Sequence, residues 1–188
     1  MKIGVYVGSF NPVHNGHVKI VNYLLEKKLD KVIMIATSNY WNKRYLLSID
    51  KRIEMLKLIS NKNIIIDEEN NDLPYTYLIM ESLKNKYKKD ELYLIIGADN
   101  IVDFDKWKEY ETLLKYNLVI INRHNININY YLKKLNKLDK YIITDSLPNI
   151  DISSTIIREN ILNNNYDNID DKINKRVLEY IIKNKLYK

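Results

Sequence analysis

KIGVYVGSFNPVHNGH, residues 2–17, is the stretch that decides the fold. Residues 3–7 form an apolar, β-branched run typical of a buried strand, and apolar residues recur at helical spacing from 16 to 29. The loop between them, residues 8–17, carries Gly8 and Gly16 in a chain that has only 4 glycines. Such a loop, joining a strand to a helix start, offers unpaired backbone N–H groups to an anion. The stretch therefore predicts a phosphate-binding turn after the first strand.

The same alternation continues along the chain. Strands are expected at 3–7, 32–36, 64–67, 92–96, 118–121 and 141–144, and helices at 16–29, 49–60, 76–87, 107–115, 130–138, 154–163 and 170–184. Alternating elements with continuously apolar strands predict an α/β fold, a single-domain, Rossmann-like, doubly wound parallel sheet. We expect one domain over residues 1–188, with a C-terminal helical part, about 153–188, packed on it.

Composition narrows the class of protein. Hydrophobic residues make up 46% and charged residues 29%, which is typical of a globular chain. The sequence has no apolar run long enough to span a membrane and no secretory signal pattern, and its 0 cysteines exclude disulfides and thiol chemistry. We therefore expect a cytoplasmic protein with no membrane partner. The net charge of +6 permits a nucleic-acid-binding domain as an alternative, but lysines spread over every helix favour no nucleic acid.

Ligands of a doubly wound sheet bind outside the carboxyl ends of its strands. The loop GSFNPVHNGH at 8–17 lies there, and it matches neither the P-loop nor the dinucleotide fingerprint. His14 and His17 are three positions apart near a helix start, so both rings can lie on one face. They could bind a metal, which needs a third ligand that is not nearby, or donate hydrogen bonds to phosphate, which we favour. The alternative is a helix cap with two surface histidines.

A second motif, DISSTIIREN at 151–160, follows the last expected strand. Ser153 can cap the helix, and Ser153, Ser154 and Thr155 with the first N–H groups form another anion site. Arg158 follows within one turn, and its planar fork suits a terminal phosphate. Taken alone, this pattern is a common helix start. Its value comes from its combination with the loop at 8–17.

Residues 8–17 resemble the T/H-x-G-H signature of the nucleotidyltransferase superfamily, and ISSTIIR at 152–158 resembles its I-S-x-T-x-I-R signature. Further blocks at 50–58, 74–76, 94–114 and 177–187 are similar to those of the bacterial nicotinate-nucleotide adenylyltransferases. The resemblance implies the nucleotidyltransferase fold and transfer of an adenylyl group from ATP, with Mg²⁺, to nicotinate mononucleotide. Nicotinamide mononucleotide and phosphopantetheine are the alternative acceptors. A homo-oligomer is left open as an alternative to a monomer.

The resemblance also assigns site residues. The catalytic group it implies is His14, His17 and Arg158. The implied ATP-binding residues are Gly8, Ser9, Phe10, Lys43, Arg44, Gly97, Asp99, Ile152, Ser153, Ser154 and Thr155. The implied mononucleotide-binding residues are Asn11, Tyr75, Thr76 and Trp107, and no protein ligand for a metal is expected. The chain departs from the family pattern at 41–43, 79 and 123–125, so we expect a differently shaped loop at 37–47.

Overall fold

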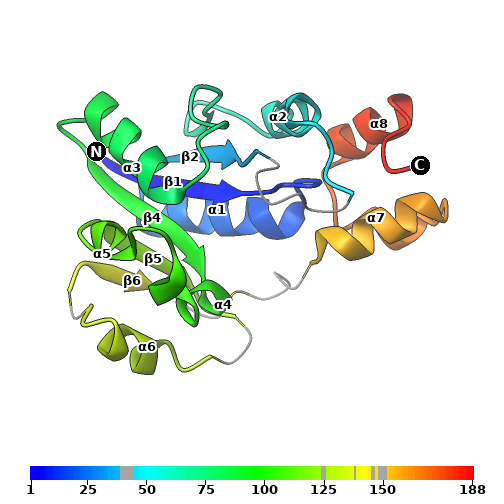
Figure 1. The fold of residues 1–188 in the computed structure, drawn as a ribbon. Helices are drawn as coiled ribbons and strands as arrows, with labels where there is room; N and C mark the ends of the chain where they lie inside the picture. Colours follow the sequence, from blue (N-terminus) through cyan, green and yellow to red (C-terminus); the bar gives the residue numbers. More distant parts are fainter. Residues whose placement is uncertain (39–44, 124–125, 138, 145–146, 148–151) are drawn as a thin grey trace.

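The computed structural model describes residues 1–38, 45–123, 126–137, 139–144, 147 and 152–188 (Figure 1). Within these ranges the chain forms one sheet in the order β3-β2-β1-β4-β5-β6, and every neighbouring pair is parallel. The strands are β1 (Lys2–Gly8), β2 (Lys31–Ala36), β3 (Ile64–Ile66), β4 (Glu91–Gly97), β5 (Asn117–Ile121) and β6 (Tyr141–Ile143). The predicted doubly wound parallel sheet is confirmed, with all six expected strands.

Helices cover both faces of the sheet. In β2, Val32, Met34 and Ala36 point into one apolar cluster and Ile33 and Ile35 into the other, because successive side chains of a strand alternate between faces. The first cluster is completed by α1 (Asn15–Lys27), α2 (Ile49–Lys57), α7 (Ser154–Leu162) and α8 (Lys175–Lys183). The second is completed by α3 (Thr76–Lys86), α4 (Ala98–Ile101), α5 (Tyr110–Leu113) and α6 (Ile128–Lys134).

Two expected helices differ from the observed ones. The helix expected at 107–115 is reduced to α5, because Glu109 adopts the left-handed backbone region (φ 53°) just before it. The helix expected at 170–184 begins only at Lys175, where the Asn174 side chain accepts a hydrogen bond from the backbone N–H of Arg176. Helix α4 and two short 3₁₀ turns, η1 (Phe104–Lys106) and η2 (Tyr166–Asn168), were not expected. No described helix is long and apolar enough to cross a membrane.

The strand order changes direction between β1 and β4. From β1 the chain continues to β2 and β3 on one side, and β4 is followed by β5 and β6 on the other. The loops that leave β1 and β4 therefore diverge at their carboxyl ends, Gly8 and Gly97, and leave a crevice there. Figure 1 shows α7 beyond the carboxyl end of β1, at the same edge of the sheet.

Candidate active site

A cavity of about 690 Å³ opens at this switch point between β1 and β4. It is walled by the loop after β1, the segment after β2, the start of α3, the loop after β4 and one residue after β5. The predicted site residues that line it are Gly8, Ser9, Phe10, His17, Tyr75, Thr76, Gly97 and Trp107. The structure thus brings together predicted residues from three separate segments, 8–17, 75–76 and 97–107, as expected of a ligand site in this kind of sheet.

The two histidines of the first loop stack on each other. His14 precedes α1, its backbone N–H donates to Nδ1 of His17 at 3.2 Å, and the ring centroids are 3.7 Å apart. Burial, assisted by the charge of Arg123, lowers the pKa of His14 to about 4, and burial holds the pKa of His17 well below its usual range. Both rings are therefore neutral. Because Nδ1 of His17 accepts, its proton is on Nε2, which is a donor.

Phe10 forms part of the cavity wall beside His17. Its backbone lies in the left-handed region (φ 44°), which is unusual for a bulky residue, and its ring is 2% exposed. The ring meets Tyr6 and His17 edge-on, with centroids 5.4 and 5.0 Å apart. A Cβ atom on Gly8 would lie 3.1 Å from the Phe10 ring, so the glycine leaves room for this packing.

Helix α7 docks onto the first loop through its N-terminal turn. The Ser154 hydroxyl donates to the carbonyl oxygen of Pro12 at 3.0 Å, and Arg158 donates from Nη1 to the carbonyl oxygen of Asn11 at 2.8 Å. Nη2 of Arg158 donates to the Thr155 hydroxyl at 3.0 Å, and the Ser153 hydroxyl accepts from the Thr155 N–H at 3.1 Å. The two motifs singled out in the sequence therefore form one polar cluster.

The structure places Asn11 behind the loop rather than in the cavity wall. Its side chain is 6% exposed, its Nδ2 donates to the carbonyl oxygen of Tyr45 at 2.9 Å, and its Oδ1 accepts from the backbone N–H of Leu47 at 3.3 Å and the hydroxyl of Tyr187 at 2.8 Å. These bonds use the amide to hold the loop. The mononucleotide contact expected of Asn11 stays a prediction, beside the positioning role that these bonds show.

The loop after β4 carries an ion pair beside the cavity. Arg123 donates from Nε and Nη2 to Oδ1 of Asp99 at 2.8 and 2.6 Å. A Cβ atom on Gly97 would lie 2.5 Å from Nη2 and 2.8 Å from Cζ of Arg123, so only glycine lets the guanidinium lie against the strand end. Arg123 lines the cavity and was not expected there. Its position directly after the strand expected at 118–121 was the available signal.

The far side of the cavity is formed by α3 and the turn before α5. Tyr75 precedes the first residue of α3, Thr76, and Trp107 packs on Phe104 with ring centroids 5.1 Å apart. Lys106 and Lys108 also line the cavity and were not anticipated. Aromatic faces together with cationic side chains suit a heteroaromatic ring that carries a phosphate.

Among the described residues, seven further expected ones do not line the cavity itself: His14, Asp99, Ile152, Ser153, Ser154, Thr155 and Arg158. Lys43 and Arg44 lie outside the described residues. Ile152 is partly buried and packs on the first apolar cluster, next to Ser153 at the start of α7. Among side chains not anticipated, Arg52 is completely buried and donates from Nη1 to the carbonyl oxygen of Ser9 at 2.8 Å. This bond supports the loop after β1.

Comparison with known proteins agrees with this geometry. The family model described as cytidylyltransferase-like matches residues 5–160, which include both signature motifs. The chain is 32% identical to the probable nicotinate-nucleotide adenylyltransferase of Clostridium acetobutylicum, covering 99% of this chain and 98% of that protein. It is 34% identical to the protein of that name from Flavobacterium johnsoniae, covering 100% of both.

Among solved structures, the Plasmodium falciparum nicotinic acid mononucleotide adenylyltransferase complexed with NaAD is similar, with a TM-score of 0.83 and 25% identity. The likeness covers 99% of this chain and 97% of that one. The chain therefore belongs to the cytidylyltransferase-like family and, within it, to the nicotinate-nucleotide adenylyltransferases. The resemblance seen in the sequence is confirmed.

Proposed function

We propose that this chain transfers the adenylyl group of ATP to nicotinate mononucleotide, giving nicotinate adenine dinucleotide and pyrophosphate, a step in the biosynthesis of NAD. One observation carries the proposal. Arg158 and the carbonyl oxygen of Asn11, 147 positions apart, are joined at 2.8 Å beside a cavity at the switch point. The relatives named above support the same reaction.

The reaction needs alignment and positive potential more than a base. The phosphate of the mononucleotide has a second pKa near 6, so it is largely a dianion at neutral pH and can attack without losing a proton. An oxygen of this phosphate forms a bond to the α-phosphorus of ATP, and the bond from that phosphorus to the bridging oxygen breaks. Pyrophosphate leaves with the electron pair. The barrier comes from repulsion between anions and from charge that develops on the leaving group.

The phosphate loop and α7 supply the donors for this charge. Neutral His17 offers Nε2–H to a phosphate oxygen, and His14, whose Nδ1 has no partner in the described part of the chain, is held beside it. We assign Arg158, already oriented by Asn11 and Thr155, to the ATP phosphates. We assign Ser153 and Thr155, at the start of α7, to binding of the adenosine. Donors held in place before substrate binds need no reorganisation during the reaction.

Magnesium belongs to the same proposal as a companion of ATP. In the described part of the chain no three His, Asp or Glu side chains converge on one point where a metal could bind. Mg²⁺ keeps most of its waters and binds substrate phosphates, so the residues present fit an ion that ATP carries. When bound, it neutralises part of the phosphate charge. We place the reaction in the cytoplasm, because a chain with 0 cysteines needs no oxidising compartment to form disulfides.

Recognition of nicotinate is assigned to Tyr75, Thr76 and Trp107. Helix α3 begins at Thr76, which lines the cavity, and the first N–H groups of a helix have no acceptor within it. The N–H of Leu78 already donates to the carbonyl oxygen of Tyr75 at 3.1 Å, so we assign those of Thr76 and Tyr77 to the substrate. Backbone donors favour the carboxylate of nicotinate over the amide of nicotinamide. An amide N–H₂ group that faces backbone N–H groups leaves donors on both sides without an acceptor. The expected preference for nicotinate mononucleotide is about 10- to 10²-fold in kcat/KM.

A pyrophosphate-release assay with ATP and Mg²⁺ tests the proposal against nicotinate mononucleotide, nicotinamide mononucleotide and phosphopantetheine. We expect the highest kcat/KM with nicotinate mononucleotide. Equal or better use of the nicotinamide form would overturn the substrate assignment and leave adenylyl transfer in place. Turnover with phosphopantetheine alone would overturn the pyridine-nucleotide assignment.

A further inference from the structure

The segment between β3 and α3 forms one wall of the cavity. It leaves β3 at Asp67, and its last part, Leu73 to Thr76, lines the cavity. Asp67 is 7% exposed although it belongs to a loop. A buried carboxylate needs partners that replace its water shell, so its contacts identify its role.

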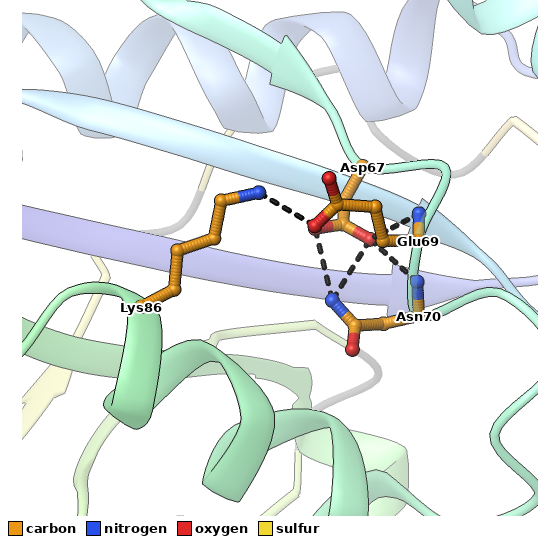
Figure 2. A network of polar contacts seen from close by, with 4 residues as sticks. All are labelled: Asp67, Glu69, Asn70 and Lys86. Carbon is orange, nitrogen blue, oxygen red and sulfur yellow. Dashed lines mark hydrogen bonds and ion pairs between the residues drawn. The ribbon is translucent and has the colours of Figure 1, made fainter.

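Asp67 closes a tight turn with the residues that follow it (Figure 2). Its Oδ1 accepts the backbone N–H groups of Glu69 at 3.1 Å and Asn70 at 2.9 Å. The Nδ2 of Asn70, a residue 4% exposed, lies 3.0 Å from each carboxylate oxygen. Three hydrogen bonds thus join Asp67 to Asn70, and a fourth joins it to Glu69. Because both carboxylate oxygens are used within the turn, Asp67 is not a substrate ligand.

The turn is connected to the cavity wall on two sides. The carbonyl oxygen of Asn70 accepts from the N–H of Leu73 at 3.3 Å, which directs the chain towards Tyr75 and Thr76. The carbonyl oxygen of Asn71 accepts from the N–H of Ser38 at 2.9 Å, and Ser38 also lines the cavity. A shift of this turn would therefore move both wall segments together.

We propose that Asp67 is a positioning residue that sets the affinity for the pyridine mononucleotide by holding the cavity wall from Leu73 to Thr76 in place. This inference rests on the proposed function, because that function puts the mononucleotide against this wall. Asp67 acts as a hydrogen-bond acceptor. The Lys86–Glu69 ion pair at 2.7 Å lies on the outside of the turn, with side chains 48% and 73% exposed, and such pairs contribute little.

The same strand provides a matched control at its other end. Asn61 precedes β3, and its Oδ1 accepts the backbone N–H groups of Asn63 at 2.8 Å and Ile64 at 3.0 Å. It makes the same kind of turn as Asp67 but does not line the cavity. Asn61→Ala therefore removes an equivalent acceptor without touching the wall.

Asp67→Ala, Asp67→Asn and Asn61→Ala are compared with the unchanged protein by steady-state kinetics for both substrates and by thermal unfolding. For Asp67→Ala we expect KM for nicotinate mononucleotide to rise about tenfold, because a small displacement of a positioning group has a large effect on binding geometry. KM for ATP is expected to stay within about twofold. Asp67→Asn keeps one oxygen for the two backbone N–H groups but turns an N–H₂ group towards Nδ2 of Asn70, so it should restore part of the affinity. Asn61→Ala should lower the Tm and leave both KM values unchanged.

If the unchanged protein is active and a folded Asp67→Ala variant has a normal KM for the mononucleotide, this inference is overturned and the proposed function is not. An equal rise of both KM values would also overturn it, since general loosening moves both. If Asp67→Ala does not fold, Asn70→Ala provides the test, and a selective rise of the mononucleotide KM of at least about threefold is then required. An unchanged protein that forms no dinucleotide would instead overturn the proposed function.

Discussion

We call the loop after β1 the phosphate side of the crevice and the wall from Leu73 to Thr76, with Trp107, the pyridine side, after the ligands proposed for them. The two sides are held together in different ways. On the phosphate side, the loop after β1 is bound by residues far away in the chain: Ser154 contacts Pro12 across 142 positions, and Tyr187 contacts Asn11 across 176. On the pyridine side, Asp67 closes its turn with residues two and three positions away. The loop after β1 is held by the tertiary fold, and the turn at Asp67 by local structure.

This difference has a consequence for stability. Long-range contacts form only after α7 and the segment after α8 have docked, so their loop-closure entropy must be overcome by packing elsewhere. A local turn costs little entropy beyond that of β3 itself. We therefore expect changes to distant segments to weaken ATP binding first and to leave the mononucleotide wall intact.

The largest effect is expected from His17→Ala, at the centre of the phosphate side. Removing one preorganised donor to developing charge typically costs about 3 kcal/mol, so kcat should fall about 10²-fold or more. His14→Ala should have a smaller effect. The measurement is turnover at saturating concentrations of both substrates, with circular dichroism as the check on folding. Unchanged turnover in a folded His17→Ala protein would contradict the donor assignment.

Acid should destabilise the phosphate side through His14. Its pKa is lowered to about 4 by burial, whereas in the unfolded chain it is near the usual 6.5, so between these values only the unfolded state takes up the proton. The free energy of unfolding should therefore fall as the pH drops through this window, by about 3 kcal/mol in total, and this contribution is fully present above pH 6.5. Denaturant unfolding at pH 7 and pH 5 measures about 2 kcal/mol of it. The loss should be smaller in His14→Gln, and the same loss in both proteins would contradict the assignment.

Trp107→Ala tests the pyridine side. The variant loses the stacking of the indole ring on the pyridine, which contributes about 1 kcal/mol or more to binding. KM for nicotinate mononucleotide should therefore rise up to about tenfold. KM for ATP should change little. Tyr130, whose side chain is 60% exposed and does not line the cavity, gives the control variant Tyr130→Ala. A larger effect on ATP than on the mononucleotide would mean that the two sides had been assigned in reverse.

The smallest effect is expected from Tyr187→Phe. It removes only the hydroxyl that donates to Oδ1 of Asn11 at 2.8 Å, a bond with a net contribution of about 1 kcal/mol. KM for ATP should rise about threefold, with the mononucleotide KM unchanged, because Asn11 carries the carbonyl group that orients Arg158. Tyr166→Phe is the control, since its hydroxyl donates to Asn164 on the exposed surface. Equal changes for both substrates would show that the two sides are not independent.

Much of the fold could be predicted because its signals are local. The six strands were recognisable as apolar runs, and the starts of α2, α3 and α7 agree with the expected ones. The prediction of a helix at 107–115 was wrong at Glu109, because the spacing of apolar residues does not reveal a left-handed backbone conformation. Gly8, His17 and Trp107 could be assigned to the site because each lies in a motif or block at the end of a strand.

The sequence by itself determined the strand–loop–helix unit at 2–27, the pair of histidines and the family. Only the tertiary structure decided that Asn11 holds the loop and that Arg123 reaches the cavity. The physical reason is the separation of the partners. The bonds of Asn11 reach 34, 36, 147 and 176 positions along the chain. Such partners come within hydrogen-bonding distance only when the sheet and the helices of one of its faces, among them α7 and α8, have packed.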